Sequence, residues 1–458
     1  MTKLTMKNPT PKGTTDRRQQ PATENPPWYG KLPERWEARK LKFLFTLVKG
    51  LNITKENLTN KGIPCVSYGE IHSKYGFEVV PEKHKLPFVS KGFLTTNPKS
   101  LLKYGDFVFA DTSEDVIGSG NFTHLNSNTP TFAGYHTIIA RPKVVMNYRY
   151  LAYFFDSPTF RSQIQRQING VKVYSITRSI LHNVTVFLPP AEMQNQIVRY
   201  LDWKVSQINK LINAKRRQIE LLKEKKQATI NSVVTKGLNP DVAYKDSGVT
   251  DIGFMPVHWE VQAFSKLFVI KAGGDVKSAL YSYEPTHEHC YPVFTNSIDK
   301  CAVYAYTKEP VFSAGSLTVT GRGAVGHAIY RETPFDAIIR LLVLTPKTAM
   351  TCEYFGYIIN ATLNFVMTTT AITQLSALQF ARYKTCVPPV KEQQKIVDYL
   401  DAHCERIDRV ISKLSEEISL FGEYRTRLIS DVVTGKLDVR DVVVPEYEAV
   451  DNVSEYNV

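Results

Sequence analysis

The sequence predicts an α/β (α+β) protein in which two similar globules alternate with two long helices. Three observations carry this expectation. A helix-forming stretch occurs twice, a shorter motif precedes each globule, and short β-branched and aromatic runs bounded by Gly, Pro or Asn lie between them. Internal repetition is the strongest of the three, because it sets the order globule, helix, globule, helix before any element is assigned.

The first repeat opens each long helix. Residues 189–202 contain Pro-Pro, Gln, Ile-Val and Tyr-Leu-Asp, and residues 388–401 contain the same residues at the same spacings. The match runs on without a gap to Val-Val-Thr at 233–235 and 432–434. An ungapped match of this length within one chain indicates duplication.

The second repeat precedes each globule. Residues 30–37 read Gly-Lys-Leu-Pro-Glu-Arg-Trp-Glu, and residues 253–260 read Gly-Phe-Met-Pro-Val-His-Trp-Glu. A weaker echo lies further on, where Tyr-Leu-Ala-Tyr at 150–153 matches Tyr-Phe-Gly-Tyr at 354–357. The duplication therefore covers the globules as well as the helices, as a pseudo-two-fold internal repeat.

Each repeated stretch predicts a long helix. Apolar residues recur in alternating steps of four and three, the heptad seam of a coiled coil, although Lys215 interrupts the first copy. Gly237 and Gly435 stand where the two helices should stop. A helix from Ala191 to Val234 would be about 65 Å long at ~1.5 Å per residue. A pseudo-two-fold duplication would make the two helices antiparallel. The expected seam consists of Leu201, Val205, Ile208, Ile212, Ile219, Leu222, Leu400, Cys404, Ile407, Ile411, Leu414, Ile418 and Phe421.

The globules between these helices are predicted to mix strands and helices. Strands are expected at Phe107–Ala110, His136–Ala140, Ser316–Thr320 and Ile338–Val343, and a helix at Tyr148–Ile168. The expected organisation is a disordered tail (1–27), the first globule (28–187), the first spacer helix (188–238), the second globule (246–386), the second spacer helix (387–438) and a polar C-terminal tail (439–458).

Composition bounds the partners and the compartment. The net charge is +13 and the pI is about 9.2, which favours a polyanionic partner. Six scattered cysteines form no CxxC pair, which suits a reducing cytosol better than a disulfide framework. No apolar run approaches the roughly 18–20 residues of a membrane span, and residues 1–27 lack the apolar region of a secretory signal. A cytoplasmic protein without a membrane partner is expected.

Two motifs suggest catalytic or metal chemistry, and neither has the context that the chemistry needs. Asn-Pro-Pro-Trp at 25–28 resembles the loop with which amino-methyltransferases hold a base, but it follows a polar tail and not a buried strand. His287, His289 and Cys290 match no common zinc spacing. No phosphate-binding P-loop occurs. The sequence therefore predicts no catalytic, cofactor-binding or metal-binding residue.

Gly-Arg-Gly-Ala-Val-Gly at 321–326 formally matches the dinucleotide-binding pattern. The residues that follow it read as a strand, so no helix N-terminus would hold a pyrophosphate. A hairpin turn is the better interpretation, and it would present Arg322 either to solvent or to a guanine edge or phosphate. The corresponding stretch of the first globule, residues 110–118, lacks this arginine, so it would read different bases, or read with Thr112 and Ser113. The candidate DNA contacts are Lys103, Thr112, Ser113, Ser119, Asn121, Gly321, Arg322, Gly323, His327 and Arg331.

The two repeated motifs together resemble the specificity (S) subunit of type I restriction-modification systems. The resemblance rests on Pro-Pro-x-x-x-Gln-x-x-Ile-Val-x-Tyr-Leu-Asp at the start of each helix and Pro-x-x-Trp-Glu before each globule, and it covers most of residues 28–440. It implies that each globule is a target recognition domain for one half of a split double-stranded DNA site, and that the helices keep the two globules at a fixed distance.

The same resemblance implies the partners. In that family the subunit does no chemistry of its own and recruits methylation (M) and restriction (R) subunits. S-adenosylmethionine, ATP and Mg would belong to those partners and not to this chain. The base-reading residues of the family vary, so none can be assigned to this chain by motif.

Two other functions stay open on the sequence. A structural coiled-coil adaptor with two protein-binding globules would share the heptad seams and the duplication. A DNA-modifying enzyme with an unrecognised site is the third possibility. Enrichment of a two-part DNA motif would separate the reader from the adaptor, and methyl transfer by the purified chain would indicate the enzyme.

Overall fold

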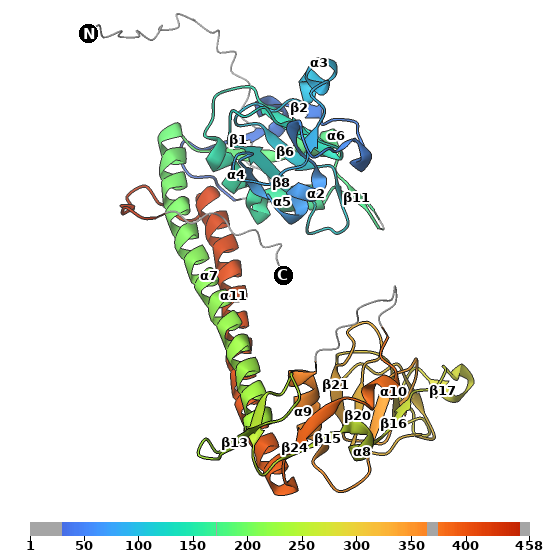
Figure 1. Ribbon diagram of the computed structural model, residues 1–458. Helices are drawn as coiled ribbons and strands as arrows, with labels where there is room; N and C mark the ends of the chain where they lie inside the picture. The colour runs from blue at the N-terminus through green and yellow to red at the C-terminus, as the bar shows by residue number, and fades with distance from the viewer. Residues whose placement is uncertain (1–29, 171, 364–373, 449–458) are drawn as a thin grey trace, which may run out of the picture. The chain divides into compact units, whose positions relative to one another are not determined.

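The computed structural model describes residues 30–170, 172–363 and 374–448. The chain divides into two compact units, one made of Met1–Ala214 and Glu417–Val458, the other of Lys215–Glu416. Each unit holds one globule together with a part of each long helix (Figure 1). The tail predicted over residues 1–27 lies outside the described residues.

The first globule is built on a five-stranded sheet. All four side chains of β6 (Phe107–Ala110) are buried, because helices cover both faces of the sheet. Phe107 and Phe109 contact Phe155 of α4 (Tyr148–Asp156), with ring centroids 4.9 and 5.5 Å apart. Val108 and Ala110 point the other way and pack in a cluster that includes Ile71 of α2 (Tyr68–Ser73). The sheet order is β2 (Phe45–Lys49), β10 (Thr137–Pro142), β6, β8 (Phe122–Leu125) and β4 (Phe77–Val79), antiparallel except for β8 and β4.

Smaller elements complete the first globule. A three-stranded sheet has the order β5–β3–β9, with β3 and β9 parallel, and two ribbons pair β1 with β12 and β7 with β11. Their bounds, and those of the helices, are β1 (Glu37–Lys40), β3 (Ile63–Val66), β5 (Phe88–Val89), β7 (Thr112–Ser113), β9 (Phe132–Ala133), β11 (Tyr174–Ser175), β12 (Thr185–Leu188), α1 (Leu41–Leu44), α2 (Tyr68–Ser73), α3 (Phe93–Thr96), α4 (Tyr148–Asp156), α5 (Pro158–Gln165), α6 (Arg178–Asn183) and the 3₁₀ turns Lys55–Asn57 and Pro98–Ser100.

The helix predicted over Tyr148–Ile168 is two helices. Ser157 has extended backbone angles (φ −72°, ψ 147°) between α4 and α5, because the residue before a proline is disfavoured in the helical region. Pro158 then occupies the first position of α5, and the Ser157 side chain accepts a hydrogen bond from Phe160 N.

The second globule repeats the main features of this arrangement, although its larger sheet has no counterpart of β4 among the described residues. The order β16–β23–β20–β21 reproduces β2–β10–β6–β8, and β18 pairs in parallel with β22 as β3 does with β9. The elements are β13 (Tyr244–Asp246), β14 (Phe254–Pro256), β15 (Glu260–Ala263), β16 (Phe268–Ala272), β17 (Tyr281–Ser282), β18 (Tyr291–Phe294), β19 (Ala305–Thr307), β20 (Ser316–Val319), β21 (Ala328–Arg331), β22 (Asp336–Ala337), β23 (Leu342–Pro346), β24 (Lys384–Val387), α8 (Phe264–Leu267), α9 (Cys352–Thr362), α10 (Ala377–Phe380) and the 3₁₀ turn Ser278–Leu280. The predicted fold class and its internal repeat are confirmed.

The strand predicted over Ile338–Val343 begins late. Ile339 and Arg340 have left-handed backbone angles (φ 54° and 59°), so β23 starts only at Leu342. His136, just before β10 in the first globule, shares this conformation (φ 54°). A left-handed residue interrupts the extended chain. Isoleucine and arginine rarely adopt this conformation, so a sequence pattern does not predict it at these positions.

Two long helices span both units. α7 (Ala191–Lys236) has 46 residues and α11 (Val390–Val433) has 44. Each ends at a glycine with positive φ, 75° at Gly237 and 74° at Gly435, as predicted. All thirteen residues of the expected seam are buried or half-buried, whereas Leu211 and Leu221, which lie off the seam, are 49% exposed.

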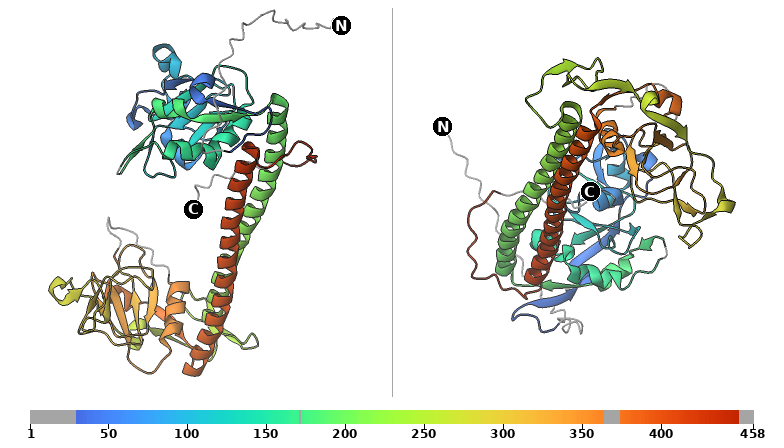
Figure 2. Two further views of the ribbon diagram at one scale, coloured as in Figure 1. Left: turned by 180° about the vertical axis from the view of Figure 1, so that it is seen from behind. Right: turned by 90° about the horizontal axis from the view of Figure 1, so that it is seen from below.

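The helices run antiparallel, side by side in each unit (Figure 1 and Figure 2). In the first unit Asn209 accepts a hydrogen bond from Arg425 at 2.9 Å. In the second unit Lys226, later in α7, lies 2.6 Å from Asp408, which is earlier in α11. Residues later in α7 thus pair with residues earlier in α11, which confirms the predicted antiparallel direction.

Residues 439–448 differ from the polar tail that the sequence predicts. Val439 is 2% exposed, and Val442 and Val444 pack against the same core of the first unit. The side-chain amide of Gln196 in α7 donates to the carbonyls of Val439 and Val442, at 2.9 and 2.7 Å. Alternate valines give this segment one apolar side, so it lies along α7 and not in solvent.

Candidate nucleic-acid interface

The glutamine of the repeated helix-start motif joins the helix to its globule. The amide oxygens of Gln194 and Gln393 accept from the backbone N–H of Asn147 (3.4 Å) and Thr351 (2.9 Å), the residues that precede α4 and α9. The amide nitrogens donate to the carbonyl of the first proline of each pair, at 2.8 and 2.9 Å. Both glutamines are buried, so their four bonds have no competition from water.

A tyrosine from each globule contacts the C-terminal end of the long helix that does not start at that globule. The hydroxyl of Tyr150 lies 2.8 Å from the carbonyl of Phe187 and 3.3 Å from that of Val433 in α11. In the second unit, the hydroxyl of Tyr354 lies 2.9 Å from the carbonyl of Val234 in α7. Each globule therefore sits at the start of one long helix and at the end of the other.

A third repeated contact joins the second tyrosine of each Tyr-x-x-Tyr to the aspartate of Tyr-Leu-Asp. Tyr153 donates to Asp202 at 2.7 Å, and Tyr357 donates to Asp401 at 2.6 Å. The residues that carry the internal repeat are thus occupied in holding globule to helix. The geometry of these contacts is the same at the two junctions.

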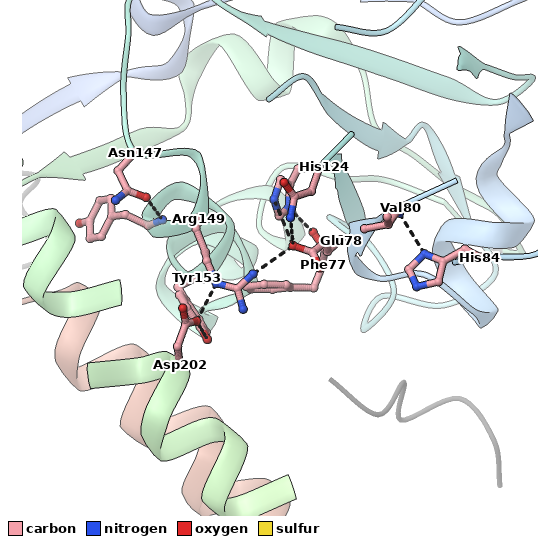
Figure 3. A network of polar contacts seen from close by, with 11 residues as sticks. Phe77, Glu78, Val80, His84, His124, Asn147, Arg149, Tyr153 and Asp202 are labelled. Atoms are coloured by element: carbon pink, nitrogen blue, oxygen red, sulfur yellow. Dashed lines mark hydrogen bonds and ion pairs between the residues drawn. The ribbon is translucent and has the colours of Figure 1, made fainter. Parts of the chain in front are cut away.

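In the first unit an arginine extends this junction (Figure 3). Arg149 of α4 donates through Nε to Asp202 of α7 at 2.6 Å and through Nη1 to Glu78 of β4 at 3.0 Å. His124 of β8 lies behind Glu78, 4% exposed, with Nδ1 2.7 Å from the carbonyl of Phe77. The position corresponding to Arg149 in the second globule is Glu353, so this network belongs to the first unit.

Acidification is expected to weaken the first unit through His124. Burial lowers the pKa of His124 below its ordinary value of 6.5, whereas the unfolded chain keeps that value. As the pH falls below about 6.5 the unfolded state therefore binds the proton first, and folding stability drops by up to about 1.4 kcal/mol per pH unit. Glu78 opposes this shift and Arg149 adds to it.

The variant His124→Gln tests this dependence, because it stays neutral and can still donate to the Phe77 carbonyl. Its unfolding free energy, measured between pH 5 and 7, should lose the slope that His124 contributes. The exposed His287→Gln variant serves as the control. Parallel pH profiles for the wild type and His124→Gln would contradict the expectation.

The candidate contacts of the first globule divide by exposure. Thr112 and Ser113 form β7, which pairs with β11 on the side of the globule away from α7 (Figure 1). Thr112 is half-buried, whereas Ser113 is only 5% exposed and is therefore not available to DNA. Lys103 is exposed, in the turn before β6. Ser119 and Asn121 are 0% and 2% exposed. Asn121 accepts from Arg161 at 2.5 Å, and its amide lies 2.9 Å from His72, so its side chain supports the turn instead of facing DNA.

The candidate contacts of the second globule divide in the same way. Residues 321–326 join β20 to β21 as a hairpin, which confirms the predicted turn, and Arg322 and Gly323 are exposed on it. His327 is half-buried, and burial lowers its pKa. Gly321 is buried where the turn meets the loop before β23.

Arg331 is misplaced among the candidates. It is 4% exposed, lies 3.5 Å from the centroid of the Phe294 ring, and donates to Thr318 Oγ1 (3.0 Å) and to the carbonyl of Lys300 (2.8 Å). Burial lowers the pKa of this guanidinium to about 10. Alternation along β21 points its side chain inward, next to the outward Tyr330, so it is a core residue.

The structure adds residues that sequence patterns did not select. In both globules the hairpin turn contacts the loop with left-handed residues before β10 or β23. Asp111 N donates to the carbonyl of His136 at 3.0 Å, and Asp111 Oδ1 lies 3.1 Å from His136 Nδ1. In the second globule the corresponding loop carries Ile339 and Arg340, both exposed. We call these two places the distal corners, residues 111–118 with 135–136 and residues 321–326 with 339–340.

The described residues contain no group of three His, Cys, Asp or Glu side chains arranged to hold a metal ion. None of the helices among them combines the length and the apolar character that a membrane crossing needs.

Comparison with known proteins agrees with this twofold arrangement. Residues 33–221 and 256–420 each match the family described as type I restriction modification DNA specificity domain. The putative type I restriction enzyme MjaX specificity subunit of Methanocaldococcus jannaschii is 25% identical over 90% of this chain and 96% of its own length. The type I restriction enzyme EcoKI specificity subunit of Escherichia coli is 25% identical over 89% of this chain and 90% of its own length.

A solved structure shares the fold. It concerns complex assembly and conformational transition of the type I R-M system, and one of its chains superposes with a TM-score of 0.70 at 16% identity, covering 89% of this chain and 100% of that one. The two family matches together cover most of the sequence, and each spans one globule with the greater part of the helix that follows it. The chain belongs to the type I restriction modification DNA specificity domain family and carries that domain twice.

Proposed function

We propose that this chain is the DNA-recognition subunit of a type I restriction-modification complex, and that each globule reads one half of a bipartite site. The observation that carries the proposal is the contrast between conserved junctions and divergent distal corners. Two copies of one scaffold share the glutamine and tyrosine contacts to the spacer helices, yet they expose acidic residues on one corner and arginines on the other. Such divergence suits two readers of different half-sites.

In this proposal the subunit contributes recognition and no chemistry. The methylation and restriction subunits of a cytoplasmic complex would bring S-adenosylmethionine, ATP and Mg, and the outward faces of α7 and α11 would dock them. The net charge of +13 favours DNA as the partner, since phosphate neutralisation supplies much of the affinity of any DNA-binding protein. Two joined readers also gain effective concentration when the spacing of the half-sites matches their span.

The experiment is a selection from randomised duplexes by the complex of this chain with its methylation subunits. A two-part motif with an unspecified spacer supports the proposal. Recovery of no motif would instead favour a structural adaptor. The purified chain alone should transfer no methyl group from S-adenosylmethionine to DNA, and robust labelling would contradict the non-catalytic role.

Shortening both helices by one heptad is expected to shorten the preferred spacer. Residues 219–225 and 409–415 face each other in the second unit, because Lys226 lies beside Asp408 in an antiparallel pair. Removing both segments deletes about 10 Å of helix, which corresponds to about three base pairs, while the heptad phase is kept.

Selection against a panel of spacers measures this change. A control that keeps the helix length and replaces the exposed Glu220 and Glu224 with alanine should retain the wild-type spacer. An unchanged spacer in the shortened protein would show that the helices do not set the distance.

A further inference from the structure

Asn296, just after β18, ties together two exposed segments of the second globule. Its side-chain oxygen accepts from the backbone N–H of Gly321 at 2.7 Å and of Arg322 at 3.2 Å. Its side-chain nitrogen donates to the carbonyl of Ile339 at 2.6 Å. One amide group thereby holds the hairpin turn against the loop before β23.

The two segments touch through their backbones. A Cβ atom at Gly321 would lie 2.8 Å from the carbonyl oxygen of Arg340, closer than Cβ atoms are found, and 3.1 Å from that of Leu375, which is also a tight contact. Leu375 N also donates to the carbonyl of Gly321 at 2.9 Å. The glycine is therefore required by this approach, which places the main chains of residues 321 and 340 side by side.

The loop is held in a costly conformation. Left-handed angles cost roughly 1–2 kcal/mol for a residue with a side chain, and Ile339 and Arg340 both adopt them. The backbone of Gly273 packs closely against the start of this loop, since a Cβ atom there would lie 2.6 Å from the carbonyl of Ala337. Strain of this kind persists only where the surroundings enforce it, and it gathers at functional sites.

The side chains that this arrangement presents are two arginines. Arg322 and Arg340 are exposed, and none of the ion pairs between described residues involves either of them. Arg322 donates through Nη2 to the neutral side-chain amide oxygen of Gln374, at 3.3 Å. The two guanidinium groups are thus exposed, and neither meets a carboxylate in an ion pair among the described residues.

The distal corner of the first globule has the opposite character. Its turn carries Asp111, Glu114 and Asp115, and Asp111 pairs with His136 of the neighbouring loop. One scaffold therefore presents carboxylates in one copy and guanidinium groups in the other. Two readers of different half-sites should differ in the side chains that face DNA. The two globules differ in charge at their distal corners.

We propose that Arg322 and Arg340 are specificity-determining residues that bind the major-groove edge of guanine in the half-site read by the second globule. Arginine donates two parallel hydrogen bonds to guanine O6 and N7, the commonest base-specific contact in protein–DNA complexes. The hydrogen bonds of Asn296 already hold the turn and the loop that carry the two arginines. These segments therefore lose little conformational freedom when DNA binds. This inference rests on the proposed function and adds the base that the corner reads.

The test uses the complex with its methylation subunits and the variants Arg322→Ala, Arg340→Ala and Lys347→Ala. Each arginine variant should lose the guanine preference at one or two positions of the second half-site and bind the wild-type site about 10- to 100-fold more weakly. The first half-site should stay unchanged. Lys347, exposed at the other end of β23, is the matched control and should alter neither half.

Two further measurements separate a base contact from a phosphate contact. Replacing the guanine with 7-deazaguanine, which lacks the N7 acceptor, should weaken the wild-type complex and leave the corresponding arginine variant unaffected. Arg322→Lys should fail to restore the motif, because an ammonium group cannot make the paired contact. Lysine rescue, or weaker binding to all sequences with a shallower salt dependence, would overturn the inference in favour of phosphate binding.

The outcomes also distinguish this inference from the proposed function. A wild-type complex that selects no bipartite motif contradicts the proposed function itself. A wild-type complex that selects such a motif, but one without guanine in its second half or one untouched by the arginine variants, overturns only the inference.

Discussion

Replacing Trp259 with alanine is expected to destabilise the second unit by about 3–5 kcal/mol, the range for removing a large buried aromatic side chain. Trp259 is 0% exposed and lies edge-on to Tyr354, with ring centroids 6.4 Å apart at 89°. A Cβ atom at Gly237 would stand 3.2 Å from its ring, so the indole fills the space under the end of α7. The cavity left by alanine would loosen globule and helix together.

The duplication supplies the control. Trp36 holds the corresponding position in the first unit, beside Gly435, but it is only half-buried. Trp36→Ala should therefore cost less. Denaturant unfolding, with hydrogen exchange to assign the loss to each unit, measures both variants. Equal losses for the two tryptophans would contradict the role given to burial.

The second large effect is expected for Asp106→Ala, at about 3–5 kcal/mol in the first unit. Asp106 is 1% exposed, and its carboxylate accepts from Arg141 Nη2 at 2.7 Å and from the backbone N–H of Lys103 at 2.9 Å. Arg141 Nη2 also donates to the carbonyl of Leu101. Alanine would leave a largely buried guanidinium without its counter-charge and an amide without its acceptor.

Two variants of the same globule check the physical cause. Glu37 pairs with Arg39 at 2.6 Å, but both side chains are exposed, so Glu37→Ala should cost less than about 1 kcal/mol. Combining Asp106→Ala with Arg141→Met should recover part of the loss, because the uncompensated charge is removed as well. Stability is read from denaturant midpoints. A double variant no better than Asp106→Ala would show that the lost amide acceptor, and not the charge, sets the cost.

The sequence predicted the parts of this fold that repeat or recur periodically. The seam from Leu201 to Phe421 follows from heptads, and Gly237 and Gly435 mark the helix ends by their backbone freedom. The Pro-Pro-x-x-x-Gln motif was recognised as a family feature, but its physical role was not visible. Only the folded chain shows that Gln194 joins the proline carbonyl to the start of α4.

The distal corners were predicted only in part. Arg322 could be placed because a glycine on each side marks a hairpin tip. Arg340 could not, since its neighbours Ile338, Ile339 and Leu341 predict a continuous strand by every local preference. Tertiary contacts to Asn296 and Gly321 impose the left-handed angles instead. Arg331 was a wrong candidate, because it lies on β21, where its side chain points into the core and is 4% exposed.

The packing of the end of α11 in the first unit has a consequence for protein synthesis. Leu428, Val432 and Val439 belong to the core of the first unit, yet the ribosome makes them after the whole second unit. The first globule therefore emerges with an apolar face that its own residues do not cover. We expect it to depend on chaperones during translation, and a nascent chain stalled before residue 417 should be more protease-sensitive in its first globule than the finished chain.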